Sequence, residues 1–162
     1  MFVQSGAHFM SPIERLSMDA IDRKVLAELI RDCRRSYRAI ARRAGVSVGT
    51  VLSRIRRLER IGVINGYAAL LDHEKLGYQL TVIAEITVSK GKLLEMEEAI
   101  GKLANTCAVY DVTGVTDAVV IAKFQSREEL SKFTKGLLAM PFVDRTNTHV
   151  VLTTVKEDFR LL

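Results

Sequence analysis

The sequence has few of the residues that build disulfide frameworks, metal sites and membrane spans. Its 162 residues include two cysteines, three histidines and no tryptophan. Cys33 and Cys107 are too few and too far apart to imply a disulfide framework, so we expect both to be small buried side chains in a reducing compartment. The histidines lack metal-ligand spacing, and we expect no metal. No uninterrupted apolar run reaches the roughly 18 residues of a transmembrane helix, so we expect no membrane partner.

Residue combinations that carry out catalysis are missing as well. We find no nucleophile with a paired base, no carboxylate pair and no histidine constellation, and therefore expect neither enzymatic activity nor a cofactor. His149 is interpreted as an interface or packing residue. The first ten residues have no basic region and no long apolar core, so they do not predict a secretory signal, and residues 1–16 are interpreted as a loose tail.

What the sequence does contain is a strong segregation of charge. Residues 11–66 carry 13 Lys and Arg against 6 Asp and Glu, a net of +7, and the remainder carries 11 against 13, a net of −2. Between Arg34 and Arg60 there are nine arginines and one acid, Glu59. Because guanidinium binds phosphate through two hydrogen bonds, this bias predicts a polyanionic partner for the N-terminal part. A hydrophobic content of 48% is sufficient for packed cores.

Residues 36–62 have the pattern of two short helices joined by a tight turn. Ser36 is a good N-cap for the first helix, and Gly45 supplies the residue that a sharp turn between helices requires. Ser47 caps a second helix, which Gly62 ends. A further amphipathic helix, capped by Asp19, is expected before this pair. Three helices in this arrangement predict a helix-turn-helix DNA-binding domain.

The exposed face of the second helix is small and polar at its start and cationic further along. Such a face allows close approach to base edges, while arginine can bind guanine or phosphate. Other arginines, at the preceding helix, are expected to position the DNA backbone. A solvated helical face without a partner is the simpler alternative, since charged runs often mean only that. The candidate DNA-binding residues are Ser36, Arg38, Arg42, Arg43, Ser47, Val48, Gly49, Thr50, Ser53, Arg54 and Arg57.

The second half of the chain changes to the periodicity of a sheet with two helices. Alternating apolar residues over 80–88 predict a half-buried strand, and Ser126 with Glu129 predicts a capping box that opens a helix. The expected order is β-α-β-β-α-β, a ferredoxin-like antiparallel sheet with both helices on one face. The other face of the sheet must then be buried by something else. Because the sequence contains no third layer, we expect a second copy of the chain to bury it. The other expected elements are a helix around 93–103, strands at 109–113, 118–122 and 143–155, and a helix from 126 to about 138.

These features together resemble the Lrp/AsnC family of feast/famine regulators, over about residues 17–158. The fold class is then α+β: an N-terminal winged helix-turn-helix (17–64) joined by a hinge strand (65–79) to a C-terminal ferredoxin-like βαββαβ domain (80–158), with a short tail (159–162). The most specific motifs are Asp19-x-x-Asp22, Ile40-Ala41 with Gly45-Val46-Ser47, Arg54-Ile55-x-Arg57-Leu58-Glu59, Gly62-Val63-Ile64-x-Gly66-Tyr67 and Thr113-Gly114-x-x-Asp117.

The resemblance implies a sequence-specific DNA-binding transcription regulator, in the cytoplasm and associated with the nucleoid. It implies a homodimer formed through the C-terminal sheet, paired hinge strands, assembly into octamers or related rings, and a small amino-acid-like effector bound between dimers. The effector candidates that carry over are Gly114, Val115, Thr116 and Asp117 in a turn, and Thr146 and Thr148 on the last strand of a neighbouring dimer.

Two alternatives stay open at this point. The segment from Gly114 to Asp117 is also simply a good β-turn, so it need not contact an effector. An architectural protein that coats DNA with little sequence preference and no effector would use the same arginines. A low ratio of specific to random binding would identify it.

Overall fold

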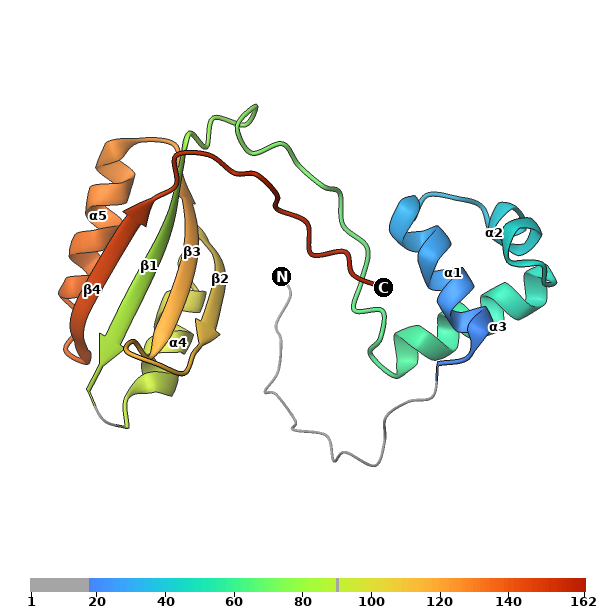
Figure 1. Ribbon diagram of the computed structural model, residues 1–162, viewed down its shortest axis with the longest axis horizontal. Helices are drawn as coiled ribbons and strands as arrows, with labels where there is room; N and C mark the ends of the chain where they lie inside the picture. The colour runs from blue at the N-terminus through green and yellow to red at the C-terminus, as the bar shows by residue number, and fades with distance from the viewer. Residues whose placement is uncertain (1–17, 90) are drawn as a thin grey trace. The chain divides into compact units, whose positions relative to one another are not determined.

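The computed structural model describes residues 18–89 and 91–162, and the chain divides into two compact units (Figure 1). The N-terminal unit extends to Ala69 and includes Asp158–Leu162, and the second unit is Leu70–Glu157. Each unit has an apolar core of its own. The whole segment interpreted as a loose tail, 1–16, lies outside the described residues, as does Ser17. Within the described ranges, no helix is both long and apolar enough to cross a bilayer.

The described part of the N-terminal unit is built from three capped helices. In each, a side chain just before the helix accepts a hydrogen bond from a backbone N–H in the first turn, which would otherwise have no partner. The caps are Asp19, Ser36 and Ser47, as the sequence predicts, and Asp22 completes a capping box with Asp19. The helices are α1 (Ala20–Arg31), α2 (Tyr37–Ala44) and α3 (Val48–Arg60).

The turn between α2 and α3 depends on Gly45. Its φ of 72° is in the left-handed region, and its N–H donates to the carbonyl of Ala41 at 2.9 Å. The chain therefore reverses direction within a few residues. Ile40 and Val51, on either side of the turn, are both fully buried in the core of this unit.

The segment after α3 differs from the expected hinge strand. Gly62, with φ of 73°, ends the helix as predicted, but residues 63–79 contain no strand in this single chain. A strand is defined by pairing, and the expected partner is the same segment of a second copy. One anchor is present: the Tyr67 hydroxyl donates to Glu59 Oε1 at 3.0 Å, which attaches the start of the segment to the end of α3.

The second unit is a four-stranded antiparallel sheet in the order β2-β3-β1-β4, with both helices on one face (Figure 1). This confirms the predicted ferredoxin-like order. Three strands differ in extent from the prediction: β2 begins three residues earlier, β3 continues to Phe124, and β4 ends at Val150. The elements are β1 (Leu80–Val88), α4 (Leu93–Gly101), β2 (Thr106–Asp111), β3 (Ala118–Phe124), α5 (Arg127–Leu138) and β4 (Val143–Val150).

The two faces of the sheet have different surroundings. On β1, Val82, Ala84 and Ile86 are fully buried against α4 and α5. Ile83 and Glu85 point to the opposite face, where Ile83 is 37% exposed. Because both helices of this unit lie on the other side of the sheet, this face is called the open face below (Figure 1).

Three predicted burial positions are wrong. Cys33 and Cys107 are exposed, because Cys33 lies in the turn after α1 and Cys107 lies where the pairing of the edge strand β2 shifts register. The helix predicted over 126 to about 138 includes Leu138 among its expected buried residues, but Leu138 is 56% exposed at the end of α5, while its neighbour Leu137 is fully buried. Adjacent helix residues point about 100° apart, and here Leu137 is the one that faces the core.

We expect two Gly→Ala substitutions to have opposite effects on stability. Gly45→Ala meets no atom within 4 Å, so its cost is the left-handed backbone alone, about 1 to 2 kcal/mol. Gly136→Ala inside α5 also meets open space but has no positive φ, and we expect it to stabilise by about 0.5 to 1 kcal/mol. Urea unfolding followed by circular dichroism measures both. If both substitutions changed stability in the same direction, the left-handed backbone at Gly45 or the helical backbone at Gly136 would be contradicted.

Candidate nucleic-acid interface and ligand pocket

The first turn of α3 presents small, exposed residues. Ser47, Val48, Gly49 and Ser53 are exposed, and Thr50 is partly buried. The Ser47 hydroxyl accepts from the backbone N–H of Thr50 at 3.0 Å and lies 2.9 Å from its hydroxyl, so both side chains are held close to the helix. The helix surface is consequently open to a groove edge here, as the sequence predicts.

Two arginines further along α3 are paired with acids of α1, which sequence reasoning did not foresee. Arg54 Nη1 lies 2.7 Å from Asp19 Oδ2 and 3.3 Å from Asp22 Oδ1, and Arg57 Nη1 lies 2.9 Å from Asp22 Oδ2. The Asp22 side chain is fully buried. Since the N–H of Asp22 donates to Asp19, the pKa of the Asp19 carboxyl is lowered, and Arg54 adds to this. Asp19 therefore faces Arg54 as an anion at neutral pH.

A second buried carboxylate of α1 gathers three more arginines. Glu28 pairs with Arg31 at 3.0 Å, with Arg35 at shorter range and with Arg43 at 3.6 Å. Its own side chain is 9% exposed, whereas that of Arg43 is 56% exposed. Arg43, a candidate phosphate contact, therefore keeps most of its surface free while its charge is partly balanced.

Other exposed arginines have no acid partner within 18–89 and 91–162. Arg38 and Arg42, both candidates from sequence, are of this kind, and so is Arg56. Arg56 was missed, although its spacing could have revealed it: it follows Ser53 by three positions and Gly49 by seven, on one stripe of the helix. Ser36 is exposed, and its hydroxyl is used as the α2 cap.

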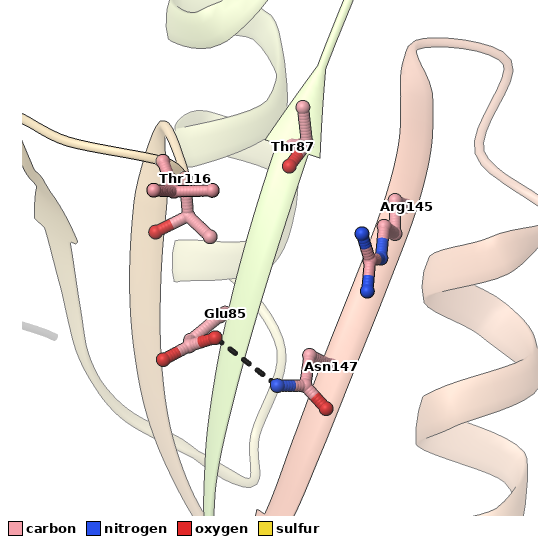
Figure 2. Close-up of a pocket in the computed structure, with 6 residues that line it drawn as sticks. Glu85, Thr87, Thr116, Arg145 and Asn147 are labelled. Atoms are coloured by element: carbon pink, nitrogen blue, oxygen red, sulfur yellow. Dashed lines mark hydrogen bonds between the residues drawn. The ribbon is translucent and has the colours of Figure 1, made fainter.

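A shallow pocket of about 100 Å³ lies on the open face of the sheet, between β1, β4 and the turn before β3 (Figure 2). The Asn147 amide donates to Glu85 Oε2 at 3.2 Å, and the Asn147 amide nitrogen lies 3.0 Å from the ring of His149. Arg145 has no ion pair with any described residue. The lining residues are Glu85, Thr87, Val115, Thr116, Arg145 and Asn147.

The structure brings part of the predicted effector site into this pocket. Thr116 and Val115 line it, and Val115 is 96% exposed. Gly114 forms the turn with φ of 135°. Asp117 has a different role: its carboxylate accepts from the N–H of Val88 at 2.8 Å, so it fastens the turn to the end of β1.

Thr146 and Thr148 do not line this pocket of the single chain, and their contribution from a neighbouring dimer stays a prediction. In the register of β1 and β4, they lie opposite the buried residues Ile86 and Ala84, on the helix side of the sheet. Alternate residues of a strand face opposite sides, so their neighbours Arg145 and Asn147 line the pocket instead. Glu85 and Thr87 were also missed, although their alternation with the buried residues of β1 places them on the open face.

Two other kinds of functional site are metal-ligand clusters and reactive thiols. Among the described residues, no group of three or more His, Cys, Asp or Glu side chains could hold a metal ion. Burial raises the pKa of the Cys107 thiol, which reduces its thiolate fraction and its reactivity.

Two family models match the chain. The model of the AsnC-type helix-turn-helix domain matches residues 18–59, and that of the Lrp/AsnC ligand binding domain matches residues 81–161. An uncharacterized HTH-type transcriptional regulator of Pyrococcus furiosus is 49% identical over 146 residues, covering 90% of this chain and 99% of that protein. The leucine-responsive regulatory protein of Klebsiella pneumoniae is 36% identical over 149 residues, covering 90% of this chain and 91% of that protein.

Solved structures are similar over nearly the whole chain. A transcriptional regulator of Neisseria meningitidis in complex with L-Met gives a TM-score of 0.83 at 26% identity, covering 90% of this chain and 97% of that chain. AsnC of E. coli gives a TM-score of 0.82 at 21% identity, covering 89% and 99%, a likeness that shows the fold alone.

The pairing of Tyr67 with Glu59 predicts a late titration. Burial, followed by the hydrogen bond to Glu59, raises the pKa of Tyr67 to about 12. The folded state holds this proton more tightly than the unfolded chain, so the contribution to stability is complete below pH 10 and is lost as the pH rises toward 12. A tyrosinate absorbance titration should show one late component that Tyr67→Phe removes and Glu59→Gln moves to lower pH. A titration without a late component would exclude the pairing.

Proposed function

The chain belongs to the Lrp/AsnC family of helix-turn-helix transcription regulators, and from this premise we propose that α3 reads DNA and that the sheet pocket binds an amino-acid effector. The observation that carries the proposal is the surface of the N-terminal unit. There the small residues at the start of α3 are exposed and lie in sequence between arginines that have no acid partner among the described residues. We propose the cytoplasm, at the nucleoid, as its place of action.

The division of the surface suits a major groove. Gly49 and Ser53 allow the helix backbone to approach base edges, and Thr50 and Arg54 provide hydrogen-bonding groups beside them. Arg38, Arg42 and Arg56, which have no acid partner among the described residues, suit phosphate, because phosphate binds arginine through two hydrogen bonds whatever the DNA sequence. Val48 offers an apolar contact to a thymine methyl group.

A second copy of the chain fits the open face of the sheet. Ile83 and Tyr110 are exposed there at 37% and 44%, and Ile121 pairs with Ile83 on the same face. Such a dimer presents two copies of α3, which we propose enter successive major grooves about one helical turn apart. Further dimers, up to an octamer, would bend the DNA along their surface.

The pocket suits a free α-amino acid. Arg145 provides a guanidinium without an acid partner in the described chain. Glu85 provides a carboxylate that contacts the Asn147 amide at 3.2 Å and the His149 ring at 3.8 Å. The carboxylate of a zwitterionic amino acid would bind Arg145, and its ammonium group would bind Glu85. The pocket, at about 100 Å³, is smaller than ordinary ligand sites, so we propose that a neighbouring copy completes it. The similar Neisseria meningitidis protein was crystallised with L-Met, which supports this class of ligand.

We expect Arg42→Ala and Arg54→Ala to affect DNA binding differently. The purified protein is titrated with the upstream DNA of its own gene and with a scrambled duplex over a range of salt. Arg42→Ala should weaken both complexes equally and reduce the salt slope by about 1, because a phosphate contact is lost. Arg54→Ala should weaken the upstream complex more. Arg127→Ala, an exposed arginine in the other unit, is the matched control and should change neither. Equal binding of both duplexes by the wild type would favour the architectural alternative.

We expect Arg145→Ala to abolish most amino-acid binding while the fold is retained. Calorimetric titration with a panel of amino acids, beginning with L-methionine, identifies the ligand of the wild type. Loss of a charged hydrogen bond to its carboxylate should reduce affinity about tenfold or more. Arg127→Ala again serves as control. Unchanged affinity in Arg145→Ala would place the effector elsewhere.

A further inference from the structure

We infer that Asp22 is a positioning residue that divides the arginines of the DNA-binding face into two kinds. It holds Arg54 and Arg57 as charge-balanced groups with fixed orientation, which contact DNA only where their free donors match a base edge. Phosphate is left to arginines without acid partners, such as Arg42 and Arg56. This inference rests on the proposed function, since it concerns how the same helix reads DNA.

The geometry around Asp22 is that of a built site. The carboxylate is fully buried, and its Oδ2 accepts from Arg57 Nη1 at 2.9 Å and from the N–H of Asp19 at 3.1 Å. Its Oδ1 lies 3.3 Å from Arg54 Nη1. The N–H of Asp22 in turn donates to Asp19 at 2.8 Å. The acid is therefore fixed by the capping box of α1 and cannot follow a moving arginine.

The pairing uses only one nitrogen of each guanidinium. Every contact of Arg54 and Arg57 with Asp19 and Asp22 is made by Nη1. Nη2 and Nε remain, and these two donors can form a bidentate contact with guanine. A guanidinium held at one nitrogen loses less conformational freedom when it binds, so the buried acid pre-organises both side chains.

The charges around the paired arginines are balanced. Two carboxylates, Asp19 and Asp22, face two guanidinium groups, whereas Arg42 and Arg56 have no acid partner in the described ranges. Affinity for random DNA follows the number of uncompensated cations near phosphate, so Arg54 and Arg57 contribute little to it. Arg54 and Arg57 then contribute mainly to the difference in affinity between the specific sequence and random DNA.

The test is Asp22→Asn, which keeps the shape of the side chain and an oxygen that can accept from Asp19. A purely structural role predicts weaker binding of every duplex. The positioning role predicts the opposite for a scrambled duplex: severalfold tighter binding and a salt slope increased by up to about 1, because Arg57 becomes a free cation. The preference for the upstream DNA should fall. The gain on scrambled DNA should disappear when Arg57→Ala is added, which a double-mutant cycle measures.

Two further variants make the test decisive. Glu98→Gln on α4 removes the same charge from the other unit and should leave scrambled-duplex binding unchanged. If Asp22→Asn does not fold, Asp19→Asn decides, since Asn is an equally good N-cap and Arg54 loses its contact at 2.7 Å. Asp19→Asn should also tighten binding of the scrambled duplex, but by less than Asp22→Asn. Unchanged or weaker scrambled binding in the folded variants overturns the inference. Absence of duplex binding by the wild type would overturn the proposed function itself.

Discussion

The N-terminal unit is organised around the burial of Asp22. An ionised carboxylate removed from water is costly unless it is paired and hydrogen-bonded, and here α1 supplies the acid while α3 supplies the cations. Satisfying this charge requires α1 and α3 to be close and in one register. The same requirement fixes the direction of Arg54 and Arg57. Packing of the helices and orientation of the two arginines proposed to read DNA thus follow from one interaction.

Local sequence signals predicted the helices of this unit, but they did not predict the ion pairs between helices. Ser36, Gly45 and Ser47 each act on atoms within a few residues, so their sequence positions were sufficient to locate the helices. Arg54 and Asp22 are 32 residues apart, and nothing in the spacing of α3 indicates that a buried acid faces it. For this reason the two arginines were predicted on the right helix without their partner.

In the sheet, too, the sequence pattern located the strands better than it predicted which side chains of the last strand face the pocket. Strong alternation of apolar residues located β1 and its inward face, and turn residues located the strand order. On β4 the alternating pattern is weak, because Arg, Thr, Asn and His follow one another. Which of them face the pocket is decided by pairing with β1. Arg145 and Asn147, each one position away from a predicted threonine, therefore line the pocket of the single chain.

The two separate cores have a consequence for how such proteins diversify. Val51 and Ile55 belong to the core of the helical unit, and Val120 and Leu137 belong to the core of the sheet unit. Each core can therefore be repacked by substitutions within its own unit. On the proposed function, changes on the exposed stripe of α3 after gene duplication can redirect a copy to new DNA while the pocket retains its ligand. The reverse exchange is equally accessible, so operator and signal can evolve independently in one lineage.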